Sequence, residues 1–202
     1  MHLINSVVFD LGNVLIDWDP RYLYRKLFKT EEEVEWFLEN ICNDKWNSKH
    51  DAGYSFSRGI NELSSIYPEF KQYIENWYYR WEEMLGAPME GTIKILESLK
   101  KKKIALFALS TWSAETFPKA EAKYDFLKLF DGKIISGNTG IVKPNTKIYE
   151  LLLNTFNLKA KNCIFIDDRV DNIKAAQAFG IHGIHFKNAQ ILKNELKKWK
   201  LL

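Results

Sequence analysis

The chain has 202 residues, of which 46% are hydrophobic and 27% are charged, and this composition excludes a disordered or collagen-like protein. Its 29 Lys and Arg nearly balance its 26 Asp and Glu, so the net charge of +3 is too small and too scattered to indicate a nucleic-acid-binding face. The two cysteines are far apart in the sequence, and no apolar stretch is long enough to cross a membrane. We therefore expect a cytoplasmic protein that binds neither nucleic acid nor membrane.

Short apolar runs that end in polar residues alternate with helical patterns along most of the chain. The apolar runs cover residues 6–10, 104–110, 133–137, 163–168 and, more weakly, 183–186, and the helical patterns cover residues 91–102, 147–156 and 171–179. This alternation is typical of an α/β fold in which helices cover both faces of a parallel sheet. Because ligands bind beyond the carboxyl ends of such strands, we expect the polar strand ends to meet at one site.

Residues 17–88 interrupt this alternation, because they contain no run typical of a strand and have the pattern of several consecutive helices. Residues 30–33 (TEEE) match a capping box before an apolar helical stripe, and Pro68 suits the first turn of another helix. Five of the seven tryptophans lie in this segment, and we expect most of them in its core. The segment is therefore predicted to be an all-helical insertion.

Polar residues from four distant parts of the chain are expected at the same edge of the sheet. They are Asp10, Ser110, Lys143 and the pair Asp167-Asp168. Carboxylates that lie this close raise one another's pKa unless a divalent cation neutralises them, and a site of oxygen ligands suits Mg²⁺. Taken alone, Asp10 would be explained as well by a cap of the following turn. The four positions together indicate a metal-dependent site for phosphate.

Four motifs occur in order along the chain. They are VVFDLGNVL at 7–15, LSTWSAETFP at 109–118, GIVKP at 140–144 and FIDDRVDN at 165–172. In these motifs the chain resembles the haloacid dehalogenase superfamily over essentially its whole length, within the branch of sugar-phosphate phosphatases and dehalogenase-like proteins. The resemblance implies a Rossmann-like parallel-sheet core of residues 1–16 and 89–202, with an all-helical cap of residues 17–88.

The resemblance implies roles for the motif residues that face the phosphate. Asp10 would attack phosphorus and form an aspartyl-phosphate intermediate. Ser110 and the backbone around Thr111 would donate hydrogen bonds to the phosphoryl oxygens. Lys143 would neutralise the charge shared by the nucleophile and the phosphate.

The resemblance also implies a magnesium site. The carboxylates of Asp10 and Asp168 and the carbonyl of Gly12 would hold Mg²⁺, with Asp167 acting directly or through water. Asn172 would orient the motif lysine or a carboxylate of the acidic loop, and the alternative is that it caps a helix end.

Gly12 departs from the family pattern, in which phosphatases commonly carry a second Asp two residues after the nucleophile. That Asp protonates the leaving alcohol and later activates water, which glycine cannot do. Asp17 and Asp19 follow closely, but their position favours hinge turns that enter the cap. The missing acid argues against a phosphomutase and leaves open which group replaces it.

Thr111 is a second departure, because the dehalogenase branch usually has Asn after the hydroxyl residue. The run that follows Thr111 nonetheless resembles haloacid dehalogenases, so a metal-free dehalogenase is an alternative. Asp167 and Asp168 favour the phosphatase, since two carboxylates would repel an anionic haloacid unless a cation were bound.

The cap contributes candidates for substrate selection in residues 43–53, where polar and aromatic groups suit a rim. Trp46, Asn47, His50 and Asp51 are these candidates, although an exposed loop position explains His50 equally well. With the core loops included, the predicted substrate-binding residues are Gly12, Asn13, Thr111, Trp46, Asn47 and His50.

These features predict a magnesium-dependent phosphatase that acts on a small phosphorylated metabolite, with a sugar phosphate as one candidate. One alternative is a haloacid dehalogenase without metal. Another is a phosphate-binding or regulatory domain in which Gly12 has abolished turnover while the phosphate site survives. The sequence indicates neither the exact substrate nor the oligomeric state.

Overall fold

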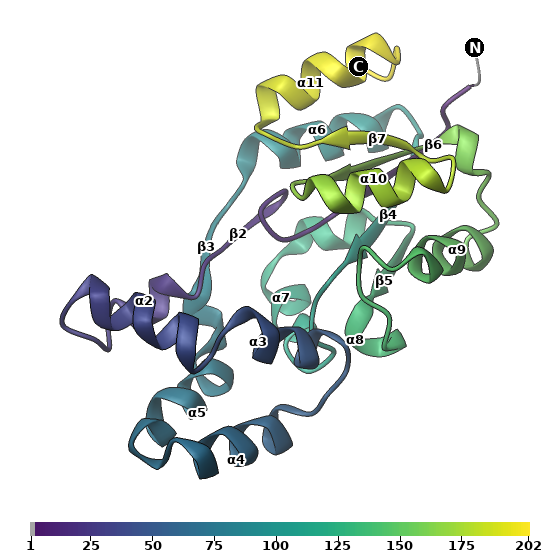
Figure 1. The fold of residues 1–202 in the computed structure, drawn as a ribbon. Coiled ribbons are helices and arrows are strands. Elements are labelled where there is room, and N and C mark those ends of the chain that lie inside the picture. The colour runs from purple at the N-terminus through teal and green to yellow at the C-terminus, as the bar shows by residue number, and fades with distance from the viewer. Residues whose placement is uncertain (1–2) are drawn as a thin grey trace.

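A five-stranded parallel sheet forms the centre of the protein in the computed structural model, which describes residues 3–202 (Figure 1). The strands are β1 (Ser6–Phe9), β4 (Ala105–Ser110), β5 (Gly132–Ile135), β6 (Cys163–Asp167) and β7 (His182–His185). Their order across the sheet is β5-β4-β1-β6-β7, and every neighbouring pair is parallel. The predicted α/β fold with a parallel sheet is confirmed.

Helices cover both faces of the sheet, because successive strand residues point to opposite sides. One face carries α6 (Glu90–Lys101), α7 (Phe117–Lys123) and α11 (Ala189–Lys198), and the other carries α9 (Thr146–Thr155) and α10 (Val170–Ala178). Val7 and Phe9 of β1 pack into the first core, whereas Val8 between them packs into the second. The remaining short elements here are α8 (Ser136–Thr139), η3 (Asp125–Leu129) and η4 (Ala160–Asn162).

The central strand β1 determines where the strand ends meet. Phe9 lies level with Ala108 of β4 and with Ile166 of β6. The amide of Asp10, the next residue, donates to the carbonyl of Ile166 at 2.8 Å. The residues that follow β1, β4 and β6 therefore lie at the same edge, as the polar strand ends predict.

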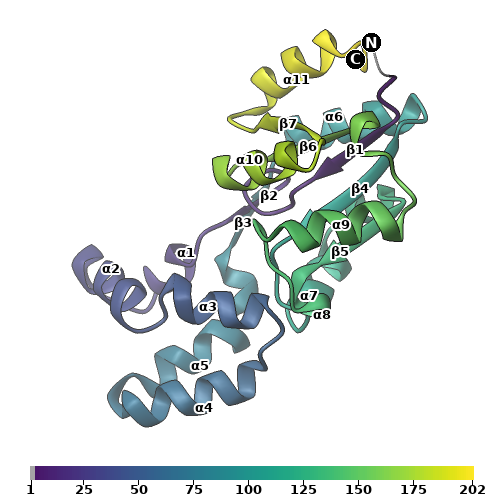
Figure 2. The same cartoon turned by 45° about the vertical axis from the view of Figure 1, so that its right-hand side comes forward.

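The segment between β2 (Ile16–Trp18) and β3 (Leu85–Pro88), residues 19–84, forms the cap, which lies at one end of the protein in both views (Figures 1 and 2). Its elements are α1 (Arg21–Tyr24), α2 (Glu31–Asn40), α3 (Asp44–Asp51), α4 (Phe56–Ile66), η1 (Pro68–Phe70), α5 (Lys71–Tyr79) and η2 (Trp81–Met84). Helix α2 begins at the predicted capping box, where the Glu33 amide donates to Thr30 Oγ1 at 3.2 Å. Within residues 3–202, every helix is too short or too polar to cross a membrane.

Two short strands join the cap to the core, so the prediction of a wholly helical insertion was wrong at its two ends. Strands β2 and β3 pair antiparallel, with Ile16 opposite Pro88 and Trp18 opposite Leu85. Strands of three and four residues are too short to show an alternating pattern, and Pro88 is a residue that strands usually exclude. The two crossings between core and cap therefore form one ribbon.

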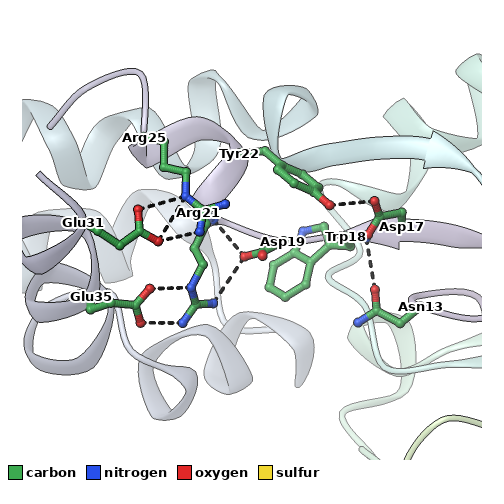
Figure 3. A network of polar contacts seen from close by, with 9 residues as sticks. All are labelled: Asn13, Asp17, Trp18, Asp19, Arg21, Tyr22, Arg25, Glu31 and Glu35. Carbon is green, nitrogen blue, oxygen red and sulfur yellow. Dashed lines mark hydrogen bonds and ion pairs between the residues drawn. The ribbon is translucent and has the colours of Figure 1, made fainter. Parts of the chain in front are cut away.

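A network of polar contacts joins helices α1 and α2 of the cap, and one of its hydrogen bonds reaches β2 of this ribbon (Figure 3). Arg21 is its centre, because Nε and Nη2 donate to the two carboxylate oxygens of Glu35 at 2.5 and 2.6 Å, while the Arg21 amide donates to Asp19 at 2.9 Å. Beside it, the Tyr22 hydroxyl donates to Asp17 at 2.7 Å. Asp17 and Asp19 are thus hinge residues, as their sequence position favours, and their carboxylates are bound by cap side chains.

Aromatic side chains form the core of the cap. Phe37 is fully buried, and its ring centroid lies 4.7 Å from that of Tyr24 and 5.8 Å from that of Phe70. Trp36 is 48% exposed, because adjacent residues leave a helix on different sides. Of the five tryptophans in the inserted segment, Trp46, Trp77 and Trp81 are buried, Trp18 is half-buried and Trp36 is exposed.

We predict that Phe37→Ala lowers the free energy of unfolding of the cap by about 3–5 kcal/mol, because it opens a cavity among packed rings. Trp36→Ala, on the exposed side of the same helix, should lower it by about 1 kcal/mol or less. Urea denaturation followed by far-ultraviolet circular dichroism measures both values. Equal losses in the two variants would contradict the packing of α2.

Candidate active site

The side chain of Lys143 lies buried at the carboxyl edge of the sheet, in the loop between α8 and α9. Its Nζ is 2.9 Å from Oδ1 of Asp10 and 2.7 Å from Oδ2 of Asp167, and it donates to the Leu109 carbonyl at 2.9 Å. Burial alone would lower the pKa of Lys143, but the two carboxylates outweigh burial and raise it. Lys143 is therefore an ammonium ion that joins the ends of β1, β4 and β6.

Asp10 follows β1 and presents one carboxylate oxygen that no protein donor uses. Its Oδ1 accepts a hydrogen bond from the Leu11 amide at 2.7 Å and lies 2.9 Å from the Lys143 ammonium, whereas Oδ2 has no partner among residues 3–202. Burial raises the pKa of Asp10 to about 7, while Lys143 opposes the rise and Asp167 adds to it. A cation beside Oδ2 would favour the ionised form that a nucleophile requires.

Protein donors occupy both carboxylate oxygens of Asp167, the last residue of β6. Nδ2 of Asn172 lies 2.9 and 3.0 Å from these oxygens, and the Arg169 amide donates to Oδ1 at 2.8 Å. The ion pair with Lys143 uses Oδ2 as well. Of the two orienting roles predicted for Asn172, the structure shows the contact with a carboxylate of the acidic loop. With its oxygens engaged in this way, Asp167 is placed to orient Lys143 and has little capacity left for a metal ion.

Three carboxylates lie close enough to share one cation. Oxygens of Asp10, Asp167 and Asp168 lie within 4.8 Å of one another. The pKa of Asp168 is raised by burial and by the charge of Asp167, and its carboxylate forms no ion pair among residues 3–202. A cluster of oxygen donors with this excess of negative charge fits a divalent cation such as Mg²⁺. The free oxygens of Asp10 and Asp168 are the best placed to bind it.

The loops after β1 and β4 bring Gly12, Ser110 and Thr111 to the same edge. Ser110 is buried at the last position of β4, and Thr111 follows it at the wall of a pocket. Gly12 reaches the same pocket, its φ lies outside the left-handed region, and a Cβ built there would have no atom within 4 Å. The glycine therefore leaves unfilled space two residues beyond Asp10.

This pocket lies between the cap and the core. It is lined by Gly12, Trp18, Asn47, Asp51, Phe56, Trp81, Thr111, Trp112, Ser113 and Thr116. Three predicted substrate-binding residues lie here, namely Gly12, Asn47 and Thr111, and so does Asp51, the other cap candidate for substrate selection. The four aromatic rings were not predicted as pocket residues. Trp112 could have been predicted as a pocket residue, because it directly follows Thr111 in the hydroxyl motif. Trp18, Phe56 and Trp81 could not, because the inserted segment is rich in aromatic residues that form its core.

Trp46 and His50 do not line this pocket, and the structure corrects the prediction that they bind substrate. Both are buried in the cap. The His50 ring stacks on Phe56 with centroids 4.0 Å apart, and the Trp46 ring contacts the His50 ring edge-on with centroids 4.5 Å apart. The reason is the helical period, since Trp46 and His50 are four residues apart and share the inward face of α3. Asn47 and Asp51 are also four apart, and they share the face toward the pocket.

Asn13 also lies outside the pocket lining. Its Oδ1 accepts a hydrogen bond from the Trp18 amide at 3.1 Å (Figure 3), and its backbone has a φ of 55°, which asparagine tolerates. Substrate binding by Asn13 stays a prediction. Its side chain stabilises the turn between the nucleophile loop and β2.

Two phosphatases are similar to this chain over most of its length. A sesquiterpene phosphatase, astK, of Aspergillus oryzae is 25% identical over 96% of this chain and 95% of its own length. A phosphorylated carbohydrates phosphatase of Thermotoga maritima is 25% identical over 90% of this chain and 84% of its own length.

A crystal structure provides a third comparison. It is that of the enzyme bt-2542 of Bacteroides thetaiotaomicron in complex with magnesium and inorganic phosphate, which has the same fold, with a TM-score of 0.71 at 21% identity over 92% of this chain and 95% of that one. The model of one protein family, the haloacid dehalogenase-like hydrolases, matches residues 4–180. Since this match spans most of the chain, the chain belongs to the haloacid dehalogenase-like hydrolase family.

Proposed function

We propose that this hydrolase is a Mg²⁺-dependent phosphatase that cleaves a small phosphorylated metabolite through an aspartyl-phosphate on Asp10. The observation that carries the proposal is the free Oδ2 of Asp10 near the carboxylate of Asp168, with the Lys143 ammonium 2.9 Å from Oδ1. This arrangement offers a nucleophile, a cation ligand and a positive charge to one phosphate group. The phosphatase relatives from A. oryzae and T. maritima support the proposal.

In the first step, the free oxygen of Asp10 attacks phosphorus, and the bond from phosphorus to the leaving alcohol breaks. Lys143 balances the charge that the nucleophile and the phosphoryl group bring together. Asp167 keeps Lys143 in this position through their ion pair. Ser110 and the backbone amide of Thr111 donate hydrogen bonds to the phosphoryl oxygens.

The second step transfers the phosphoryl group from Asp10 to water and restores the carboxylate. Bound by Asp10, Asp168 and the Gly12 carbonyl, Mg²⁺ would supply Lewis-acid stabilisation of the phosphoryl oxygens in both steps. Both steps also need a proton to move, first to the alcohol and then from water. Gly12 has no side chain that can move it.

The aromatic lining of the pocket favours a substrate whose leaving group is an organic alcohol. Trp18, Phe56, Trp81 and Trp112 offer rings that pack on hydrocarbon or on the apolar face of a sugar, and Asn47 offers hydrogen bonds. The two phosphatase relatives are named for a sesquiterpene and for phosphorylated carbohydrates. Both classes therefore belong in the first substrate screen, with a sugar phosphate retained as a candidate.

The site gives less support to a metal-free dehalogenase. The substrate of that reaction is an anion, and three carboxylates within 4.8 Å would repel it without a cation. Halide release from 2-chloropropionate in the presence of EDTA would establish the dehalogenase instead. Phosphate binding without turnover of any ester would favour the regulatory domain.

We predict that Asp10→Asn lowers phosphatase turnover by roughly 10³-fold or more, because the amide keeps the shape of the side chain but is not a nucleophile. Acid quenching of the wild type during turnover of a ³²P-labelled ester should leave label on the protein, and the variant should carry none. Asp171→Asn is the matched control, since its carboxylate is 72% exposed. Turnover within tenfold of the wild type in a folded Asp10→Asn protein would overturn the covalent mechanism.

We predict that Asp168→Ala weakens Mg²⁺ binding by at least about tenfold and lowers turnover with it, since its carboxylate is free to bind the ion. Asp167→Asn should lower turnover with a smaller change in Mg²⁺ affinity, because protein donors already occupy both Asp167 oxygens. Isothermal titration with Mg²⁺ and the Mg²⁺ dependence of the rate measure the two effects. The reverse order of affinities would place the ion on Asp167.

A further inference from the structure

We propose that Asp51, at the last turn of cap helix α3, is the general acid and base of this hydrolase and does the work for which Gly12 has no side chain. The inference rests on the proposed phosphatase function and names a further catalytic residue for it. It starts from the juxtaposition of Asp51 with Gly12 and Thr111 around one pocket.

Asp51 lines this pocket together with Asn47 of the cap and with Gly12 and Thr111 of the core loops. Asn47, one turn earlier in α3, donates from Nδ2 to Asp51 Oδ2 at 3.1 Å. No ion pair to Asp51 forms among residues 3–202, so no cation holds its carboxyl group permanently ionised. Asp17 and Asp19, the first acids that follow Gly12 in the sequence, are bound at the hinge and do not line the pocket.

Contacts with the core fix the position of Asp51. The Ser136 hydroxyl donates to the Asp51 carbonyl at 2.6 Å and accepts from the Trp112 amide at 3.0 Å. Two residues further on, a Cβ built on Gly53 would lie 2.7 Å from the Gly137 carbonyl, so the cap loop touches the core backbone there. Asp51 is thus attached to α8, which directly follows β5.

A second attachment of the cap to the core lies shortly after Gly53 in the sequence. The Phe56 amide, at the start of α4, donates to the Glu115 carboxylate of the core at 2.8 Å. The cap segment that carries Asp51 is therefore held to the core on both sides of Gly53. An acid that must meet a leaving group within hydrogen-bond distance needs this kind of fixed placement.

The surroundings of Asp51 suit a group that gives and then takes a proton. Desolvation in the pocket raises its pKa to about 7, with the Ser113 amide opposing the rise and the charge of Asp44 adding to it. Asp44 is on α3 itself, and Ser113 belongs to the hydroxyl loop of the core. Near neutral pH the acid and the base forms are therefore both populated.

The proton balance of the reaction is then complete. As Asp10 bonds to phosphorus and the phosphorus–alcohol bond breaks, protonated Asp51 gives its proton to the departing oxygen. The Asp51 carboxylate next takes a proton from water, whose oxygen bonds to phosphorus. The bond from phosphorus to Asp10 breaks, which leaves phosphate, an ionised Asp10 and a protonated Asp51 for the next cycle.

The test compares an alkyl ester with an aryl ester in Asp51→Asn. The kcat/KM for glycerol 1-phosphate should fall about 10²–10⁴-fold, because its alkoxide needs a proton. The kcat/KM for p-nitrophenyl phosphate should fall less than about tenfold, since its leaving group is stable as an anion. With the aryl ester, a burst of nitrophenolate and accumulation of the aspartyl-phosphate are expected, because the second step still lacks its base.

Asp44→Asn is the matched control, with the same substitution on an exposed position of the same helix, and the Asp44 charge is the smallest of the three influences on the Asp51 pKa. It should keep the ratio of the two kcat/KM values within about threefold of the wild type. The pH profile gives an independent readout. In the wild type, kcat/KM for glycerol 1-phosphate should fall as the pH rises through the Asp51 pKa; Asp51→Asn should lose this limb and Asp51→Glu should retain it.

Gly12→Asp provides a rescue, because the open space at Gly12 and its ordinary φ admit a carboxylate. Added to Asp51→Asn, it should raise kcat/KM for glycerol 1-phosphate at least about tenfold. Equal losses for both esters with an unchanged pH profile and no rescue would overturn the role of Asp51. If turnover requires Asp10 but not Asp51, the role of Asp51 is overturned and the phosphatase proposal stands. If the wild-type protein hydrolyses neither ester in the presence of Mg²⁺, the phosphatase proposal is overturned as well.

Discussion

The buried ammonium of Lys143 is the interaction on which the rest of the site depends. A charge at this depth is stable only with close partners, and Asp10 and Asp167 provide them at 2.9 and 2.7 Å. Because its third contact is the Leu109 carbonyl, one side chain joins the ends of three parallel strands. The single positive charge of Lys143 does not neutralise the carboxylates of Asp10, Asp167 and Asp168, so the cluster keeps a net negative charge. The edge of the sheet therefore suits a cation, and a bound cation attracts phosphate.

The sequence predicted the core half of the site because topology alone brings its residues together. Once buried runs end in Asp10, Ser110 and Asp167, a parallel sheet places them at one edge whatever the loops do. The cap half depends on which side of α3 turns inward, and polar residues lie on both sides of that helix. The prediction therefore included Asn47, which lines the pocket, but also His50, which packs against Phe56 instead.

The strands β2 and β3 escaped prediction for a different reason. Their pairing requires residues 16–18 to meet residues 85–88, and a contact between segments so far apart leaves no local pattern in either. Asn13 is a related case, because its hydrogen bond to Trp18 exists only once β2 has formed. Strand β2 contributes Trp18 to the pocket wall, so the shape of the pocket depends on the ribbon as well as on the cap.

The hydroxyl of Ser136 has a consequence for product release. It holds the Trp112 amide of the hydroxyl loop and the Asp51 carbonyl of the cap at the same time. Any motion that lifts the cap from the core must break the second bond, and it then removes Asp51 from the pocket in the same movement. On the proposed role of Asp51, opening the cap would also withdraw the acid and base, so an open enzyme could bind or discharge its ligand but could not turn it over.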